Sequence, residues 1–257
     1  KHVNLVEINI FEAIRNNFFG TLNIVKLSKA FNIEKFILIS SDKAVRPTSI
    51  MGATKRLSEL IVHAYANGMD IENKSFTIFS TVRFGNVLAS SGSAIEKFYR
   101  QIENRESITV THPDVTRYFM SIREAVHLIL ESCTISKGGD VFILNMGEPI
   151  KILDLARKML KLYGKIEKND INTDGDIEIK FTGLKQGEKL TEELLLDGDQ
   201  EETINKDLFV ANESFILYEK FRQFIIDIEN QFDKLDYADI LNILSKYNIQ
   251  FNHNKYE

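Results

Sequence analysis

The sequence is poor in several features that define large classes of protein. It has one cysteine, Cys133, in 257 residues, which excludes a disulfide framework and is typical of a reducing compartment. No apolar run approaches the roughly 20 residues that a membrane-spanning helix needs, so we expect no segment to cross a bilayer. Basic residues are not in excess: 32 Lys and Arg face 37 Asp and Glu, which argues against a nucleic-acid-binding protein with a basic surface.

What the chain does contain is enough apolar residues for a core. Hydrophobic residues make up 44% of the sequence, which excludes wholesale disorder. Short apolar runs at 36–40, 76–83 and 140–145 predict buried strands. Helical spacing of apolar residues predicts helices over 11–31, 50–67, 122–133 and 152–163. This alternation indicates an α/β fold, a doubly wound parallel sheet with helices on both faces. After it we expect a polar loop over 165–176, an edge strand over 177–181 and amphipathic helix from 218 onward.

The segment that follows the predicted strand at 36–40 carries the most chemistry. In open parallel sheets ligands bind at the carboxyl ends of the strands, which is where Ser41, Asp42 and Lys43 lie. Neighbouring Asp and Lys side chains can supply an acid and a base. Met51 and Lys55 are four residues apart and share one face of the next helix. On spacing alone, a solvated charge pair in front of a helix fits equally well.

The stretch SSDKAVRPTSIMGATKR at 40–56 resembles the extended short-chain dehydrogenase/reductases. More narrowly, it resembles the nucleotide-sugar 4,6-dehydratases of the polysaccharide biosynthesis (CapD-like) group. Further blocks match in the same order over residues 1 to about 196, which is far more specific than one motif. They lie at 1–3 with 16–21, 82–93, 109–120, 145–149 and 183–190.

The resemblance implies an NAD- or NADP-dependent lyase that acts on a UDP-sugar of the UDP-N-acetylglucosamine type. Oxidation at C4 of the sugar makes the C5 proton acidic, water leaves across C5 and C6, and the hydride returns to C6. The product, a 4-keto-6-deoxy sugar nucleotide, would serve capsule, O-antigen or protein glycan synthesis. Two alternatives stay open, a sugar-nucleotide epimerase on the same scaffold and a non-catalytic truncated remnant.

The family pattern also implies roles for the residues near 41–55. Asp42 would be the acid and Lys43 the base of the elimination, while Ser41 would bind the C4 oxygen. Most of the superfamily has Tyr at the position of Met51, and a thioether cannot exchange a proton. Met there resembles the large membrane-associated branch of the dehydratases, so we expect an active enzyme whose C4 proton leaves through Asp42 or a water.

Binding residues follow from the same resemblance and from charge. Lys55 would hold the nicotinamide ribose, with Asn17 and Arg83 also on the cofactor side. Lys185 stands where the family more often has Arg and so loses the bidentate fork. No ligand-spaced group predicts a metal site. The residues assigned to the substrate are Lys1, Asn86, Ser93, Arg117, Lys185 and Glu188.

The chain lacks the Gly-x-Gly-x-x-Gly loop that holds a dinucleotide pyrophosphate, and it begins with Lys rather than Met. We therefore expect 1–146 to be the C-terminal half of a Rossmann domain, with a substrate-domain excursion near 86–116. Residues 147–257 would form the substrate-binding domain and C-terminal helices. The parent enzyme would be cytoplasmic and homo-oligomeric, without a nucleic-acid partner, and would reach the inner membrane only through a preceding part.

Overall fold

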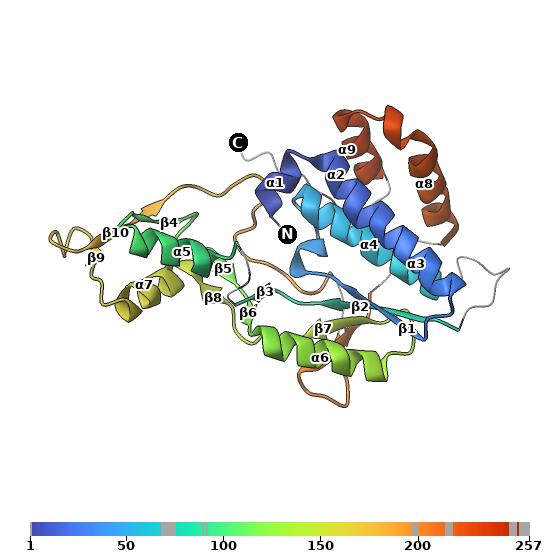
Figure 1. Ribbon diagram of the computed structural model, residues 1–257, viewed down its shortest axis with the longest axis horizontal. Helices are drawn as coiled ribbons and strands as arrows, with labels where there is room; N and C mark the ends of the chain where they lie inside the picture. The colour runs from blue at the N-terminus through green and yellow to red at the C-terminus, as the bar shows by residue number, and fades with distance from the viewer. Residues whose placement is uncertain are drawn as a thin grey trace.

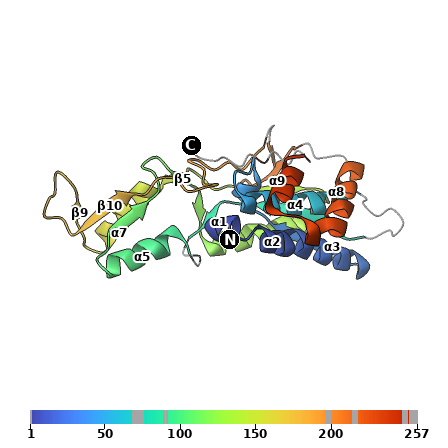
Figure 2. The same cartoon turned by 90° about the horizontal axis from the view of Figure 1, so that it is seen from above.

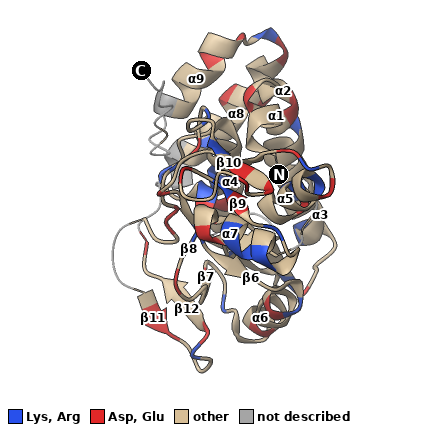
Figure 3. Ribbon diagram, turned by 90° about the vertical axis from the view of Figure 1, so that its left-hand side faces the viewer, with Lys and Arg blue, Asp and Glu red and all other residues tan. Residues whose placement is uncertain are grey.

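The structure is a computed structural model that describes residues 2–67, 76–88, 90, 92–196, 200–213, 218–246 and 251. Figure 1 shows a central sheet with helices above and below it, and a smaller lobe to one side. The view from above places the same lobe beyond the end of the helical layer (Figure 2). Lys and Arg are interspersed with Asp and Glu on the face of the smaller lobe (Figure 3).

The central sheet contains the strands that the apolar runs predicted. The three predicted strands run parallel to one another, with Phe36 opposite Phe79 and Val82 opposite Phe142. Two later strands, at 208–211 and 200–202, are added antiparallel at one edge of the sheet. The mainly parallel α/β architecture is thereby confirmed. In spatial order the sheet consists of β1 (Lys35–Ile39), β2 (Ile78–Arg83), β7 (Val141–Leu144), β12 (Leu208–Ala211) and β11 (Gln200–Glu202).

Helices cover both faces of this sheet. The lower face in Figure 1 carries α6 (Ile122–Ile135), which a Ser121–Glu124 capping box starts. On the upper face α4 (Ile50–Ala66) is central, and it buries apolar side chains such as Leu57 and Ile61 against the rest of the layer. The remaining helices of that layer are α1 (Val3–Glu7), α2 (Ile10–Ala13), the π-helix η1 (Ile14–Phe19), α3 (Gly20–Ala30), α8 (Tyr218–Gln231), η3 (Phe232–Lys234) and α9 (Tyr237–Lys246).

The smaller lobe has a core of its own. The amphipathic helices α5 (Ala94–Glu103) and α7 (Ile152–Leu162) pack Phe98 and Leu160 against a three-stranded parallel sheet. The segment predicted as an edge strand is instead the middle strand of this sheet, since it pairs with a neighbouring strand on each side. The predicted loop before it contains a short strand as well. The sheet has the order β4 (Ile108–Val110), β10 (Ile177–Phe181), β9 (Glu167–Lys168).

Short strand pairs link the lobe to the main sheet. They are β3 (Asn86–Val87) with β6 (Phe119–Met120), and β5 (Thr116–Arg117) with β8 (Ile150–Lys151). Segments that follow residue 146 pack in both parts of the structure. The segment 200–211 returns to the main sheet as β11 and β12, and α8 and α9 join the upper helical layer, because their apolar faces complete that core.

Candidate active site

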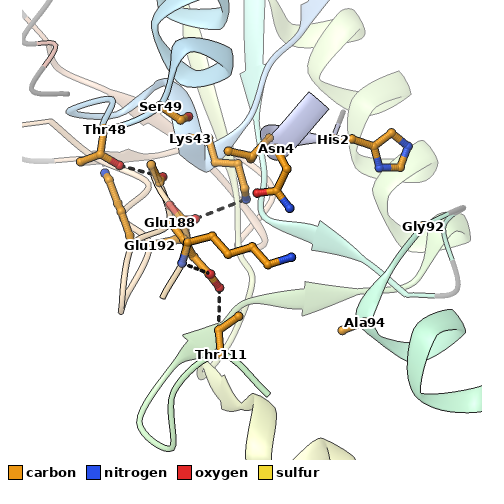
Figure 4. A pocket seen from close by; sticks show the side chains of 14 residues that line it. His2, Asn4, Lys43, Thr48, Ser49, Gly92, Ala94, Thr111, Glu188 and Glu192 are labelled. Atoms are coloured by element: carbon orange, nitrogen blue, oxygen red, sulfur yellow. Dashed lines mark hydrogen bonds and ion pairs between the residues drawn. The ribbon is translucent and has the colours of Figure 1, made fainter. Parts of the chain in front are cut away.

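A large cavity lies at the carboxyl ends of β1 and β2, between the main sheet and the smaller lobe. This main cavity has a volume of about 710 Å³. A neighbouring side hollow of about 320 Å³ (Figure 4) shares five lining residues with it, Lys43, Gly92, Ala94, Thr111 and Glu188. The structure brings most of the predicted site residues to the main cavity. Those lining it are Asn17, Ser41, Lys43, Met51, Lys55, Asn86, Ser93, Arg117 and Glu188.

The short 3-10 helix η2 (Asp42–Ala44) carries the predicted acid and base, of which Lys43 lines both the main cavity and the side hollow and Asp42 lines neither. Ser41 caps it, since its Oγ accepts from the Lys43 backbone N–H. Ser41 Oγ also donates to Asp42 Oδ1 at 2.7 Å, and Lys43 Nζ donates to the same oxygen at 3.0 Å. The Asp42 side chain is fully buried, and its Oδ2 has no hydrogen-bond partner among the described residues. Asp42 Oδ1 therefore accepts hydrogen bonds from both the Ser41 hydroxyl and the Lys43 amine.

Lys43 meets a second carboxylate that the sequence analysis did not single out. Glu192 Oε1 lies 3.5 Å from Lys43 Nζ in the side hollow. Burial lowers the pKa of Lys43, but the carboxylates of Asp42 and Glu192 outweigh that effect and raise the pKa above its ordinary value. The resting form of Lys43 at neutral pH is therefore the ammonium. The four-residue spacing from Glu188 to Glu192 is the only sequence signal that could have drawn attention to it.

The side of the main cavity predicted to bind the cofactor is built by α4 and η1. Lys55 Nζ donates to the carbonyl of Ile39 at 3.4 Å; burial lowers the pKa of Lys55, with the Glu59 charge opposing. Asn17 lies in the wide turns of the π-helix, a form that is frequent at functional sites. Its Nδ2 donates to Thr54 Oγ1 at 2.9 Å. Met51 is buried in the wall of the cavity.

Gly52 allows α4 to approach η2 closely. A Cβ at this position would run into the backbone carbonyl of Lys43 and would lie 3.0 Å from Pro47 Cβ. We expect Gly52→Ala to lower the free energy of unfolding by about 1–3 kcal/mol, because the Lys43 backbone cannot move away from the added methyl group. It should also displace Asp42 and Lys43 and so lower activity. Thermal and denaturant unfolding measure the first effect.

Gly20→Ala is the matched control for that prediction. Gly20 is also helical, but its added Cβ would meet only the Arg15 carbonyl at an ordinary 3.8 Å. Alanine should there stabilise the helix by roughly 0.5–1 kcal/mol. Equal effects of the two substitutions would show that the contact between α4 and η2 is not tight.

The side of the main cavity predicted to bind the substrate contains an ion pair between Arg117 and Glu188. Arg117 Nη2 lies 3.2 Å from Glu188 Oε1, and Thr111 Oγ1 donates to that same oxygen at 2.8 Å. The backbone N–H of Lys185 donates to Glu188 Oε2 at 3.1 Å. Glu188 thereby neutralises Arg117 in the absence of ligand. An anionic ligand would compete for the same guanidinium.

The other residues predicted to bind the substrate lie in different places. Ser93 caps α5, because its Oγ accepts from the Glu96 N–H. Lys185 lines the side hollow rather than the main cavity, and Lys1 lies outside the described residues. Lys97, which the sequence analysis missed, lines the main cavity from α5. Burial and the nearby Lys185 charge lower the pKa of Lys97.

The structure does not bring Arg83 to the cavity. Its guanidinium is fully buried behind it, 2.7 Å from Glu59 and in contact with Glu213. Arg56 joins the same two carboxylates, and Ser40 Oγ donates to Glu59 Oε1 at 2.6 Å. These four charges tie α4 to the end of β2 and to the segment after β12, and the Ser40 hydroxyl adds a link to the end of β1. The position of Arg83 fits support of the site rather than the predicted contact with a cofactor.

Neither a metal-binding cluster nor a membrane-spanning helix occurs in the described ranges. No three His, Cys, Asp or Glu side chains there are grouped so that they could hold a metal ion. No helix in those ranges is long and apolar enough to cross a membrane.

Comparison with known proteins shows the family of this chain. Residues 1–213 match the family described as polysaccharide biosynthesis protein. The capsular polysaccharide biosynthesis protein CapD of Staphylococcus aureus is 49% identical over 195 residues, which are 76% of this chain and 31% of that protein. This chain thus spans under a third of the length of that relative.

Solved structures with a similar fold also match this chain. The structure of Pen from Bacillus thuringiensis is 35% identical, with a TM-score of 0.72, covering 88% of this chain and 72% of Pen. DesIV of Streptomyces venezuelae, a dTDP-glucose 4,6-dehydratase with NAD and TYD bound, shares the fold at 14% identity and a TM-score of 0.62, covering 96% of this chain and 70% of DesIV. Proteins named as sugar-nucleotide 4-epimerases also match. The chain belongs to the CapD-like family of polysaccharide biosynthesis proteins, within the extended short-chain dehydrogenase/reductase superfamily.

Proposed function

We propose that this chain carries the catalytic residues of a nucleotide-sugar 4,6-dehydratase that acts on a UDP-N-acetylhexosamine with a nicotinamide cofactor. The observation that carries the proposal is the Asp42–Lys43 pair, joined at 3.0 Å at the end of β1. An elimination needs an acid and a base on neighbouring atoms of the sugar. Epimerisation at C4 needs no acid or base at C5 and C6, and by the family pattern it relies on the tyrosine that Met51 replaces to move the C4 hydroxyl proton. The family membership supports a nucleotide-sugar substrate.

The described residues fit the nicotinamide end of an NAD or NADP molecule. Lys55 faces the main cavity and uses one donor on the Ile39 carbonyl, which leaves further N–H groups for ribose hydroxyls. The sequence holds no Gly-x-Gly-x-x-Gly cradle for the pyrophosphate. When bound, the cofactor would accept a hydride from C4 and return it to C6.

The acid gains its proton from the substrate, and the base must first lose one. The C4 hydroxyl proton reaches Asp42 Oδ1 during the oxidation, so Asp42 is protonated when the elimination begins. The resting amine of Lys43 is an ammonium that donates to Asp42 Oδ1 at 3.0 Å, so it releases a proton to solvent and then takes the C5 proton as a neutral base. Protonated Asp42 gives its proton to the departing C6 hydroxyl, which leaves as water. A solvent proton is added at C5 as the hydride returns to C6, and Lys43 is again an ammonium and Asp42 a carboxylate.

The proton of the C4 hydroxyl needs a separate route, because Met51 cannot accept it. Ser41 Oγ already donates to Asp42 Oδ1 at 2.7 Å. Ser41 would relay the C4 proton to that carboxylate while the hydride leaves C4. This relay takes the place of the usual tyrosine and agrees with the predicted exit through Asp42.

We also propose that the sheet continues beyond β1 in the complete enzyme. In the described part of the chain β1 is the last strand on its side. Apolar side chains are exposed on both helical layers next to it, with Leu27 of α3 at 55% and Leu130 of α6 at 64%. A further βαβ segment would bury these faces and supply the missing pyrophosphate loop.

The experiment that tests the function is product analysis. The chain, and the longest natural polypeptide that contains it, are incubated with UDP-N-acetylglucosamine and NAD⁺ or NADP⁺. The expected product is a 4-keto-6-deoxy sugar nucleotide, identified by mass spectrometry and NMR. Formation of the C4 epimer alone by the longer polypeptide would refute the dehydratase proposal.

A further inference from the structure

Glu192 lies where the predicted reactive amine meets the predicted nucleotide-binding arginine. Its Oε1 is 3.5 Å from Lys43 Nζ and 3.9 Å from Arg117 Nε. Its side chain is only 4% exposed, and its Oε2 has no hydrogen-bond partner among the described residues. Figure 4 shows it pointing toward Lys43 from the segment that follows Glu188. Burying a carboxylate with one oxygen unpaired costs free energy, and the two flanking cations, Lys43 and Arg117, offset that cost.

We propose that Glu192 is a positioning residue of this site, which holds Lys43 and Arg117 in one ion-paired row and so ties the reactive amine to the phosphate-binding end. The inference rests on the proposed function. The row reads Asp42, Lys43, Glu192, Arg117, Glu188, with alternating sign. Glu192 is its central member, and its removal would leave two cations facing each other across the hollow.

The row also sets the protonation of the amine. Three charged groups act on Lys43: Asp42 from η2, Glu192 from the segment after β10, and Arg117 from β5. The two carboxylates raise the pKa of Lys43, whereas burial and Arg117 lower it. Loss of the Glu192 charge therefore lowers the pKa of Lys43. The other titratable groups that line the side hollow are His2, Lys185, Glu188 and Lys189.

The test measures the Lys43 amine directly. Glu192→Gln keeps the shape of the side chain and removes its charge. Trace acetylation with acetic anhydride, followed by peptide mass spectrometry, reports the neutral fraction of each lysine as pH is varied. We expect the Lys43 midpoint to fall by about 1–3 pH units in the variant. Labelling at pH 9 should then rise about tenfold for each unit, while exposed lysines serve as the internal reference.

Two variants separate positioning from a merely structural effect. Glu193→Gln changes the neighbouring, half-exposed carboxylate that pairs with Arg46, and it should leave the Lys43 midpoint unchanged. Glu192→Asp restores the charge and should recover most of the midpoint. An unchanged midpoint in folded Glu192→Gln overturns the inference. Because acetylation needs no turnover, this result is independent of whether the complete enzyme proves to be a dehydratase.

Discussion

Replacing Lys43 with glutamine will lower the turnover of a UDP-N-acetylhexosamine by about 10²–10⁴, the usual effect of losing one acid–base group. Glutamine preserves much of the side chain's length but neither gives nor takes a proton at neutral pH. Binding of UDP, measured by calorimetry, should change far less, because Arg117 and Glu188 lie at the other end of the ion-paired row. The kinetic effect should therefore fall on kcat rather than on KM.

The matched control for Lys43 is another lysine in an ion pair. Lys151 pairs with Asp114 at 3.0 Å, but both side chains are at least half exposed and far along the chain from η2. Lys151→Gln should leave kcat unchanged within a factor of about two, in line with the small worth of exposed pairs. A full-activity Lys43→Gln enzyme would show that the base lies elsewhere.

Replacing Glu59 with glutamine will destabilise the fold by about 3–5 kcal/mol, the usual cost of breaking a buried ion pair from one side. The side chain is fully buried, and two arginines and Ser40 depend on it. Burial raises the pKa of Glu59, but Arg83 and Arg56 outweigh it and lower the pKa to about 2. The stabilisation is therefore complete above the unfolded value of about 4.3 and is lost as pH falls toward 2.

Denaturant unfolding at pH 7 and at pH 3 measures this effect. The difference between wild type and Glu59→Gln should be largest at pH 7 and smaller at pH 3. Glu229→Gln, which breaks an exposed pair with Lys26, should cost only about 0.2–1 kcal/mol. Equal small losses for both variants would show that the four-charge network does not hold α4 to the end of β2.

Local pattern was enough to predict the core of this site. The apolar run before Ser41 and the helical spacing after Ser49 predicted a strand and a helix, and the structure joins them through η2. Because parallel strands end at one edge, the cavity was expected there, and nine of the predicted residues line it. The pairing of Asp42 with Lys43 follows from their adjacency.

Contacts between segments that are distant along the chain could not be predicted from the sequence. Glu192 meets Lys43 across almost 150 residues, and no periodicity encodes that approach. Arg83 is the last residue of a predicted strand that ends at the site, yet its side chain turns to Glu59 and Glu213 behind the cavity. The return of β12 beside β7 depends on the packing of Leu208 into the sheet core. Each of these depends on tertiary packing rather than on local spacing.

The fate of the C4 hydrogen tests the central claim most directly. The longest polypeptide that contains this chain is supplied with UDP-N-acetylglucosamine deuterated at C4, and the product is examined by NMR. A 4,6-dehydratase must deliver the deuterium to the new C6 methyl group, with a solvent proton at C5. Deuterium retained at C4 of an epimerised sugar would contradict the account, because the Asp42–Lys43 pair would then have taken no part in an elimination.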